Sequence, residues 1–161
     1  MARIIDTAEV VPVLRQLFIT ACHELDDNLV DALKDGVSKE ESPLGKEVLE
    51  TLIENAMIAR RDHVASCQDT GTAIVYMQIG QEVSWIGRPL MEQINEGVRQ
   101  GYRDGFLRAS ILDPLTRINT KDNTPAVVHT DIVEGDTVTI SVLPKGGGSE
   151  NMGRLAMLVP A

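Results

Sequence analysis

The first 62 residues carry a helical pattern of apolar positions. After Thr7, apolar residues recur every three or four positions, and this spacing predicts a helix that Thr7 caps. A second, short helix is expected from about Asp26 to Lys39. Ser42 followed by Pro43 is typical of a helix start and predicts a third helix. The predicted buried face of the third helix consists of Leu44, Val48, Leu49, Leu52, Ile53, Ala56 and Met57.

The later half of the chain alternates strand patterns with one more helix. The β-branched run "TAIVYMQIG" predicts a strand, and "RPLMEQINEGVRQGYRDGFL" predicts an amphipathic helix that begins near Pro89. The runs "AVVHTDIV" and "TVTISVL" are separated by a short glycine-containing segment at residues 134–136, which predicts a β-hairpin. Residues 1–161 are therefore expected to form one α+β domain, with a helical N-terminal region followed by mixed strands, a helix and a β-hairpin.

Charge and hydropathy exclude two classes of partner. The 161 residues carry a formal charge of −9, whereas binding to a phosphate backbone depends on clustered Lys and Arg. No apolar run approaches the roughly 18 to 20 residues of a membrane helix, and "MARIIDTAEV" lacks the apolar block of a signal peptide. We therefore expect a cytoplasmic protein that binds neither nucleic acid nor membrane.

The last residues are unusually apolar for a chain terminus. The segment "PKGGGSENMGRLAMLVPA" ends directly after an apolar stretch, without the polar tail that is common at chain ends. This pattern predicts that the sequence is the front part of a longer protein. Such a chain could hold only part of an active site.

A run of three glycines follows the last predicted strand. Residues 146–148 have no Cβ, so their peptide N–H groups can turn toward one point and a ligand can approach the backbone closely. The run could be an anion site or a flexible connection. The spacing of a P-loop is not met, because no Lys-Ser or Lys-Thr pair follows the glycines.

The two cysteines lie in different surroundings. Cys22 lies on the apolar face of the first predicted helix, which favours core packing. Cys67 lies in the polar turn "SCQDTGTA", outside any apolar pattern. It could be a nucleophile assisted by His63, a metal ligand or part of an ordinary loop. A zinc site is disfavoured because no CxxC pair is present.

Three segments resemble one known family. "SCQDTGTA" and "KGGGSENMGRLAMLVPA" are similar to segments of the iron–sulfur class of fumarate hydratases, the class I hydro-lyases, and in particular to the N-terminal part of their α subunit. The intermediate "FLRASILDPLTRINTKDNTPAVVH" resembles the same family, so the resemblance spans nearly the whole chain. The α subunit of L-tartrate dehydratase is a close relative of this family.

The resemblance implies roles for five residues. The family holds a 4Fe-4S cluster with three cysteines, and the one in its CQDTG motif corresponds to Cys67. Gln68 and Asp69 are implied substrate contacts. Arg108 and the backbone near Gly148 are implied contacts to the substrate carboxylates. Apart from the resemblance, a dianion needs local positive charge, for which Arg103 and Lys145 are weaker candidates than Arg108. Adding water to fumarate requires a Lewis acid and groups that hold two carboxylates, and this set of residues suits that chemistry.

The sequence departs from the family pattern in two respects. Two further cluster cysteines are expected after the glycine run, and the given sequence ends before them. The residues that remove the substrate proton belong to the β subunit or C-terminal domain of the family, so no catalytic residue is assigned within this chain. The chain is thus expected to act as part of an oligomeric enzyme of the tricarboxylic acid cycle and to be inactive alone.

Two readings from other classes stay open at this point. The chain could be a non-catalytic module for anion binding or assembly, or an enzyme that uses Cys67 and His63 as a nucleophilic pair. Within the hydro-lyase class, tartrate is the alternative substrate to fumarate and malate.

Overall fold

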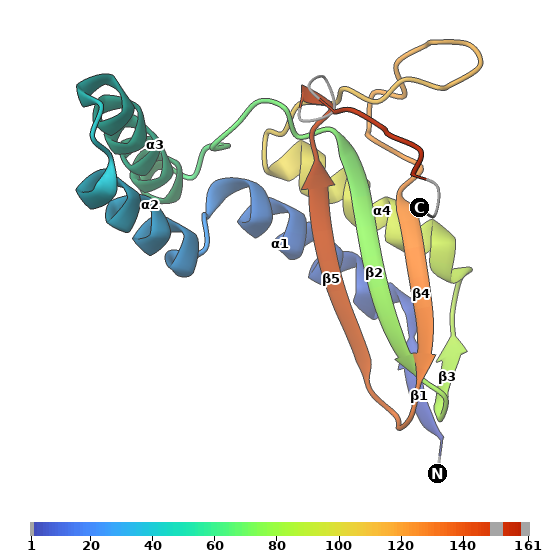
Figure 1. Ribbon diagram of the computed structural model, residues 1–161. Helices are drawn as coiled ribbons and strands as arrows, with labels where there is room; N and C mark the ends of the chain where they lie inside the picture. The colour runs from blue at the N-terminus through green and yellow to red at the C-terminus, as the bar shows by residue number, and fades with distance from the viewer. Residues whose placement is uncertain (1, 149–152, 159–161) are drawn as a thin grey trace.

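The computed structural model describes residues 2–148 and 153–158, in which helices pack on one face of a sheet (Figure 1). The strands are β1 (Arg3–Asp6), β2 (Thr72–Gly80), β3 (Val83–Ile86), β4 (Val127–Val133) and β5 (Val138–Lys145). The helices are the 3₁₀ turn η1 (Thr7–Glu9), α1 (Val10–His23), α2 (Asp27–Lys39), α3 (Pro43–Asp62) and α4 (Leu90–Asp104). This single compact domain confirms the predicted α+β class.

Strand β2 is the centre of the main sheet. It pairs with β4 in parallel and with β5 in antiparallel orientation, so the strand order is β4-β2-β5. The strands of the predicted hairpin are present, but the predicted pairing between them is wrong. Both strands instead satisfy the backbone groups of β2, one along each edge. Their connection crosses the end of β2, where Gly80 N–H donates to Thr137 O and Glu82 N–H donates to Gly135 O.

Helices α1 and α4 cover one face of the sheet and enclose the core (Figure 1). Leu14 and Phe18 of α1 meet Ile94 and Val98 of α4, and all four side chains are fully buried. The two helices lie unusually close at Gly97, where a Cβ would fall 2.7 Å from Leu14 Cβ. Gly97 therefore sets the distance between α1 and α4.

Gly97→Ala is expected to destabilise the domain by about 1 to 3 kcal/mol, the usual cost of forcing extra volume into a packed interface. Gly36→Ala is the matched control, because its Cβ would lie 3.5 Å from Leu49 Cδ1, an ordinary contact in a helix interior. That control should gain up to about 1 kcal/mol from helix propensity. Urea unfolding of both variants measures the difference, and equal stabilities would contradict the close approach of α1 and α4.

Helices α2 and α3 form a pair that projects away from the sheet (Figure 1). The predicted starts at Asp26 and Ser42 are confirmed, since each side chain accepts the expected capping hydrogen bond. The predicted wide buried face of α3 is wrong: Leu44 is 69% and Val48 is 51% exposed. Because α3 packs mainly on α2, its buried stripe is narrow. No helix in residues 2–148 and 153–158 is long and apolar enough to cross a membrane.

The start of the chain also differs from the predicted pattern. Asp6, rather than Thr7, caps the first helical turn and forms a capping box with Glu9. Thr7 is buried, and its hydroxyl donates to Arg88 O at 2.8 Å. Strands β1 and β3 were not predicted, because four residues are too few to show an alternating pattern.

Candidate functional site

Cys67 lies in the turn between α3 and β2. Helix α3 ends at Asp62, and the next residue, His63, has a left-handed backbone that reverses the chain direction. Ser66 then attaches the turn to the end of α1, because its N–H donates to Cys22 O at 2.9 Å. The Cys67 side chain is exposed, and its Sγ accepts a hydrogen bond from Asp69 N–H at 3.4 Å. The turn thus presents a thiol at the surface in a defined orientation.

The glycine run folds over the same turn. Gly147 N–H donates to Asp69 Oδ1 at 3.2 Å, and Gly148 N–H donates to Asp69 Oδ2 at 2.7 Å. Two adjacent N–H groups therefore converge on one carboxylate, as an anion site requires. A Cβ at Gly146 would lie 2.7 Å from Asp69 Cγ, so the close approach depends on glycine at that position. Residues 149–152 and 159–161 of the family-like end segment lie outside the described residues.

Arg108 lies in the loop that follows α4, and this loop joins the same site. Thr70 Oγ1 donates to Arg108 O at 2.8 Å, which fixes the loop beside the Cys67 turn. The Arg108 residue is exposed, and no hydrogen bond or ion pair of its guanidinium is present within the described residues. Arg103 differs, because its guanidinium is paired with Asp104 at 2.7 Å. The structure therefore brings the backbone of the Arg108 loop to the turn of Cys67 and Asp69, and the glycine run contacts the same turn.

Gln68, the remaining predicted substrate contact, is exposed in the same turn. Its place between Cys67 and Asp69 leaves the carboxamide accessible to a ligand at the surface. Arg103 and Lys145, the weaker cationic candidates, are both engaged: Lys145 Nζ donates to Gly146 O at 3.0 Å.

Three buried residues that the sequence analysis did not identify hold the site together. Thr70, Tyr102 and Asn123 are 3%, 3% and 0% exposed. The Tyr102 hydroxyl donates to Thr70 O at 3.0 Å, and Asn123 Nδ2 donates to Gly71 O at 2.8 Å. Burial raises the pKa of Tyr102 to about 12, so this hydroxyl keeps its proton at neutral pH. Asn123 lies in a polar loop typical of turns, so the sequence carried no signal of its burial.

The cysteines differ in their capacity to bind metal. Cys22 is buried, which confirms its predicted core packing. Burial raises the pKa of its thiol to about 11, and the nearby Cys67 adds to this shift. Both cysteines line a hollow of about 280 Å³ beside the turn. The described residues contain no group of three or more His, Cys, Asp or Glu side chains that could hold a metal ion. Of the two thiols, Cys67 is the exposed one, so it is the thiol that an external group can reach.

A nucleophilic pair of Cys67 and His63 finds no support in the contacts. Both residues are exposed, and the described residues include no hydrogen bond between the His63 ring and Cys67 Sγ. The backbone N–H of His63 caps α3 by donating to Ala59 O. His63 therefore serves as the cap of α3.

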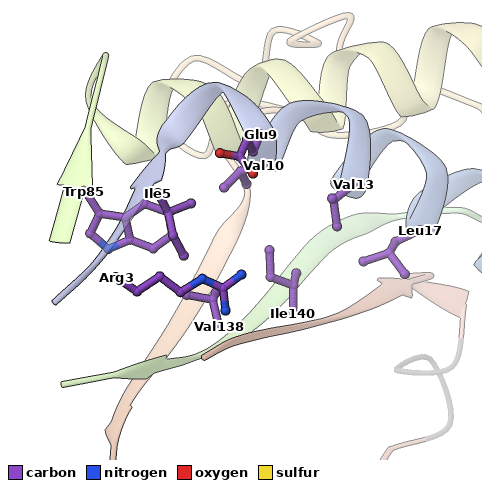
Figure 2. Close-up of a pocket in the computed structure, with 9 residues that line it drawn as sticks. All are labelled: Arg3, Ile5, Glu9, Val10, Val13, Leu17, Trp85, Val138 and Ile140. Atoms are coloured by element: carbon purple, nitrogen blue, oxygen red, sulfur yellow. The ribbon is translucent and has the colours of Figure 1, made fainter. Parts of the chain in front are cut away.

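A second hollow, of about 330 Å³, lies between α1 and the strands β1, β3 and β5 (Figure 2). Its walls are mainly apolar, with Trp85 at one end, and its charged residues are Arg3 and Glu9. None of the residues predicted from the sequence for the site lines it. The chemistry suggested by the sequence therefore belongs to the Cys67 turn.

Known proteins that resemble this chain point to the same family. The family model described as fumarate hydratase (fumerase) matches residues 12–161. A Methanocaldococcus jannaschii protein named as a candidate L(+)-tartrate dehydratase subunit alpha is 36% identical over 155 residues, which cover 92% of this chain and 54% of that protein. The class I anaerobic fumarate hydratase of Escherichia coli is 37% identical over 115 residues, covering 70% of this chain and 21% of that protein.

The chain belongs to the fumarate hydratase family. It spans about half the length of the first of these relatives and about a fifth of the second.

Proposed function

We propose that this chain is the α-subunit part of an iron–sulfur hydro-lyase that hydrates fumarate to malate reversibly. The observation that carries the proposal is the convergence of the Cys67 turn, the Arg108 loop and the glycine run, which are distant in the sequence. Membership of the fumarate hydratase family supports the reaction class. The proposed assembly is oligomeric and cytoplasmic, and it serves the tricarboxylic acid cycle.

The proposed cofactor is a 4Fe-4S cluster with Cys67 as one ligand. The exposed thiol is accessible to a cluster, and Asp69 N–H holds the sulfur in place. The other thiolates are supplied by protein outside residues 1–161. When bound, an iron with an open coordination position supplies the Lewis acid that activates a hydroxyl group.

The remaining residues of the site bind and orient a small dicarboxylate. The Arg108 guanidinium has the planar fork that fits a carboxylate. Its positive charge attracts a dianion locally, against the repulsion from a chain with a formal charge of −9. Gln68 donates its amide hydrogens to the substrate, and Asp69 accepts a hydroxyl proton or orients a basic neighbour. Gly148 N–H is a further hydrogen-bond donor for the substrate. In the structure it donates to the Asp69 carboxylate.

Tartrate is the second candidate substrate. The Methanocaldococcus jannaschii relative is named for tartrate dehydration and aligns with 92% of this chain. Both reactions remove or add water beside a carboxylate, so the same binding groups serve either. The ratio of activities on fumarate and L-tartrate distinguishes them.

The isolated chain is expected to fold but to remain colourless and inactive. One thiolate cannot retain a cubane cluster, and lack of a catalytic base typically lowers a rate about 100- to 10,000-fold. The chain is purified anaerobically, reconstituted with iron and sulfide, and assayed for visible absorbance and fumarate hydration, with and without the β subunit. Cluster and turnover should appear only in the complete assembly.

The same experiment separates the alternatives. A non-catalytic module predicts no turnover even with the β subunit. A Cys67 nucleophile predicts a metal-independent activity that iodoacetamide abolishes. A stoichiometric cluster on this chain alone would overturn the partial-site proposal.

A further inference from the structure

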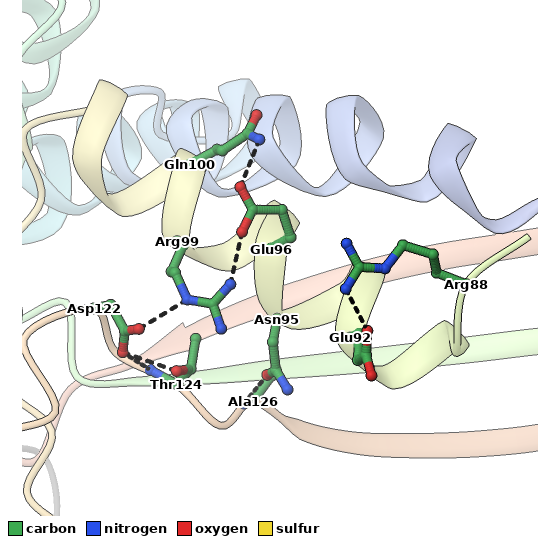
Figure 3. Close-up of polar contacts among 9 residues, drawn as sticks. All are labelled: Arg88, Glu92, Asn95, Glu96, Arg99, Gln100, Asp122, Thr124 and Ala126. Carbon is green, nitrogen blue, oxygen red and sulfur yellow. Dashed lines mark hydrogen bonds and ion pairs between the residues drawn. The ribbon is translucent and has the colours of Figure 1, made fainter.

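Asn123 lies where the segments of the site meet. Its side chain is fully buried, and its backbone has a φ of 57°, a conformation that Asn tolerates better than most residues. The loop around it is attached to α4 on both sides (Figure 3). Arg99 Nε donates to Asp122 Oδ2 at 2.9 Å, and Ala126 N–H donates to Asn95 Oδ1 at 2.9 Å. The helix therefore fixes the position from which the Asn123 amide reaches the site.

The amide of Asn123 uses both of its ends. On the acceptor side, Oδ1 receives the N–H groups of Ser110 and Ile111 at 2.8 and 3.1 Å. On the donor side, Nδ2 donates to Gly71 O at 2.8 Å and to Arg108 O at 3.4 Å. A carboxamide has two N–H donors and one acceptor oxygen with two lone pairs, so this set satisfies the whole group.

These four contacts connect two chain segments that carry proposed substrate contacts. Gly71 ends the turn that contains Gln68 and Asp69, and Ser110 and Ile111 lie two and three residues after Arg108. We infer that Asn123 is a positioning residue, which holds the Arg108 loop at a fixed distance from the Asp69 turn so that both can bind one dicarboxylate. This inference rests on the proposed hydro-lyase function. The connection itself, however, can be measured without any activity.

The connection is tested in this chain with Asn123→Gly. Glycine adopts the positive φ without strain and removes all four hydrogen bonds. Hydrogen exchange of the Ser110 and Ile111 amides should become at least about tenfold faster, because each loses its acceptor. Asn119→Ala is the matched control in the same loop: it removes the bond from Asn119 Nδ2 to Ala109 O at 2.9 Å but leaves Asn123 Oδ1 as the acceptor for Ser110 and Ile111. Exchange at Ser110 and Ile111 that is unchanged in Asn123→Gly overturns the inference.

The consequence for substrate binding is tested in the complete enzyme with Asn123→Asp. Aspartate keeps the size and the acceptor oxygen for Ser110 and Ile111, but an ionised carboxylate has no hydrogen to donate to Gly71 O. The Asp69 turn should then shift relative to Arg108. We expect KM for fumarate to rise about tenfold while kcat changes less than about threefold. This pattern is expected because the variant loses binding energy that the substrate and the transition state share.

A purely structural role of Asn123 predicts a different result. Loss of folded enzyme lowers the apparent kcat and leaves KM unchanged. Met77→Ala, in the core of β2, serves as the comparison because it lowers stability at a distance from the site. An unchanged KM in Asn123→Asp, or an equal rise in Met77→Ala, overturns the positioning role even if Asn123→Gly fails to fold. If the wild-type assembly hydrates no dicarboxylate, the proposed function fails, whereas the exchange experiment still decides whether Asn123 connects the two segments.

Discussion

Replacing Cys67 by serine in the complete enzyme is expected to lower fumarate hydration by on the order of a thousandfold or more. A Lewis acid at the reacting oxygen contributes several kcal/mol, and each factor of ten in rate corresponds to about 1.4 kcal/mol. Serine has nearly the same size but is a poor ligand for iron, so the cluster should be lost with the activity. The exposed position of Cys67 means that the fold should be unaffected.

The measurements are visible absorbance, iron and sulfide content, and circular dichroism of the anaerobically reconstituted enzyme. Cys22→Ser is the matched control, because Cys22 is buried and lines the same hollow from α1. That variant should unfold more easily, since a hydroxyl replaces an apolar group in the core, yet it should keep the cluster. Equal cluster content in the wild type and in Cys67→Ser would falsify the assignment of Cys67 as a ligand.

Arg108→Lys in the complete enzyme is expected to lower kcat/KM by roughly 30-fold or more. Losing one bidentate contact between Arg and a carboxylate costs on the order of 2 to 4 kcal/mol in transition-state binding. Lysine keeps the charge but offers a single ammonium, which cannot reproduce the fork of the guanidinium. The effect should be similar for hydration of fumarate and dehydration of malate, because both substrates carry two carboxylates.

Arg103→Lys is the control, because Arg103 is also an arginine and lies in the last turn of α4, just before the Arg108 loop. Arg103 pairs with Asp104 on the exposed side of α4, so its replacement should leave the kinetics nearly normal. Steady-state kinetics of both variants, together with a thermal unfolding curve, separates substrate binding from stability. Near-normal kinetics of Arg108→Lys would move the proposed role to Arg103 or Lys145.

The start of α3 and the bounds of β2 could be predicted because interactions between residues close in the sequence determine them. Ser42 and Pro43 start α3, and the β-branched run at 72–80 forms β2 with the predicted bounds. Capping and side-chain periodicity act within a few residues, so they are visible in the sequence. The predicted core position of Cys22 followed from the same periodicity and is confirmed.

The pairing of the strands could not be predicted in the same way. A short glycine-containing connection between β4 and β5 favours a hairpin, but the structure inserts β2 between them. The exposed Leu44 and Val48 of α3 show the same limit, since burial depends on which elements meet. Both outcomes depend on which segments, distant in the sequence, pack against each other. The local pattern of apolar residues carries no information about that choice.

For the candidate site, the sequence by itself determined which chemical groups are available: a thiol at Cys67, a carboxylate at Asp69, a guanidinium at Arg108 and the glycine run. Only the tertiary structure decided that the N–H groups of Gly147 and Gly148 bind Asp69 and that the buried Asn123 amide connects Gly71 with the Arg108 loop. The reason is physical, because residue type fixes what a side chain can donate or accept. Which partner it meets, 15 to 79 residues away in the sequence, depends on how β2, β5 and α4 pack together.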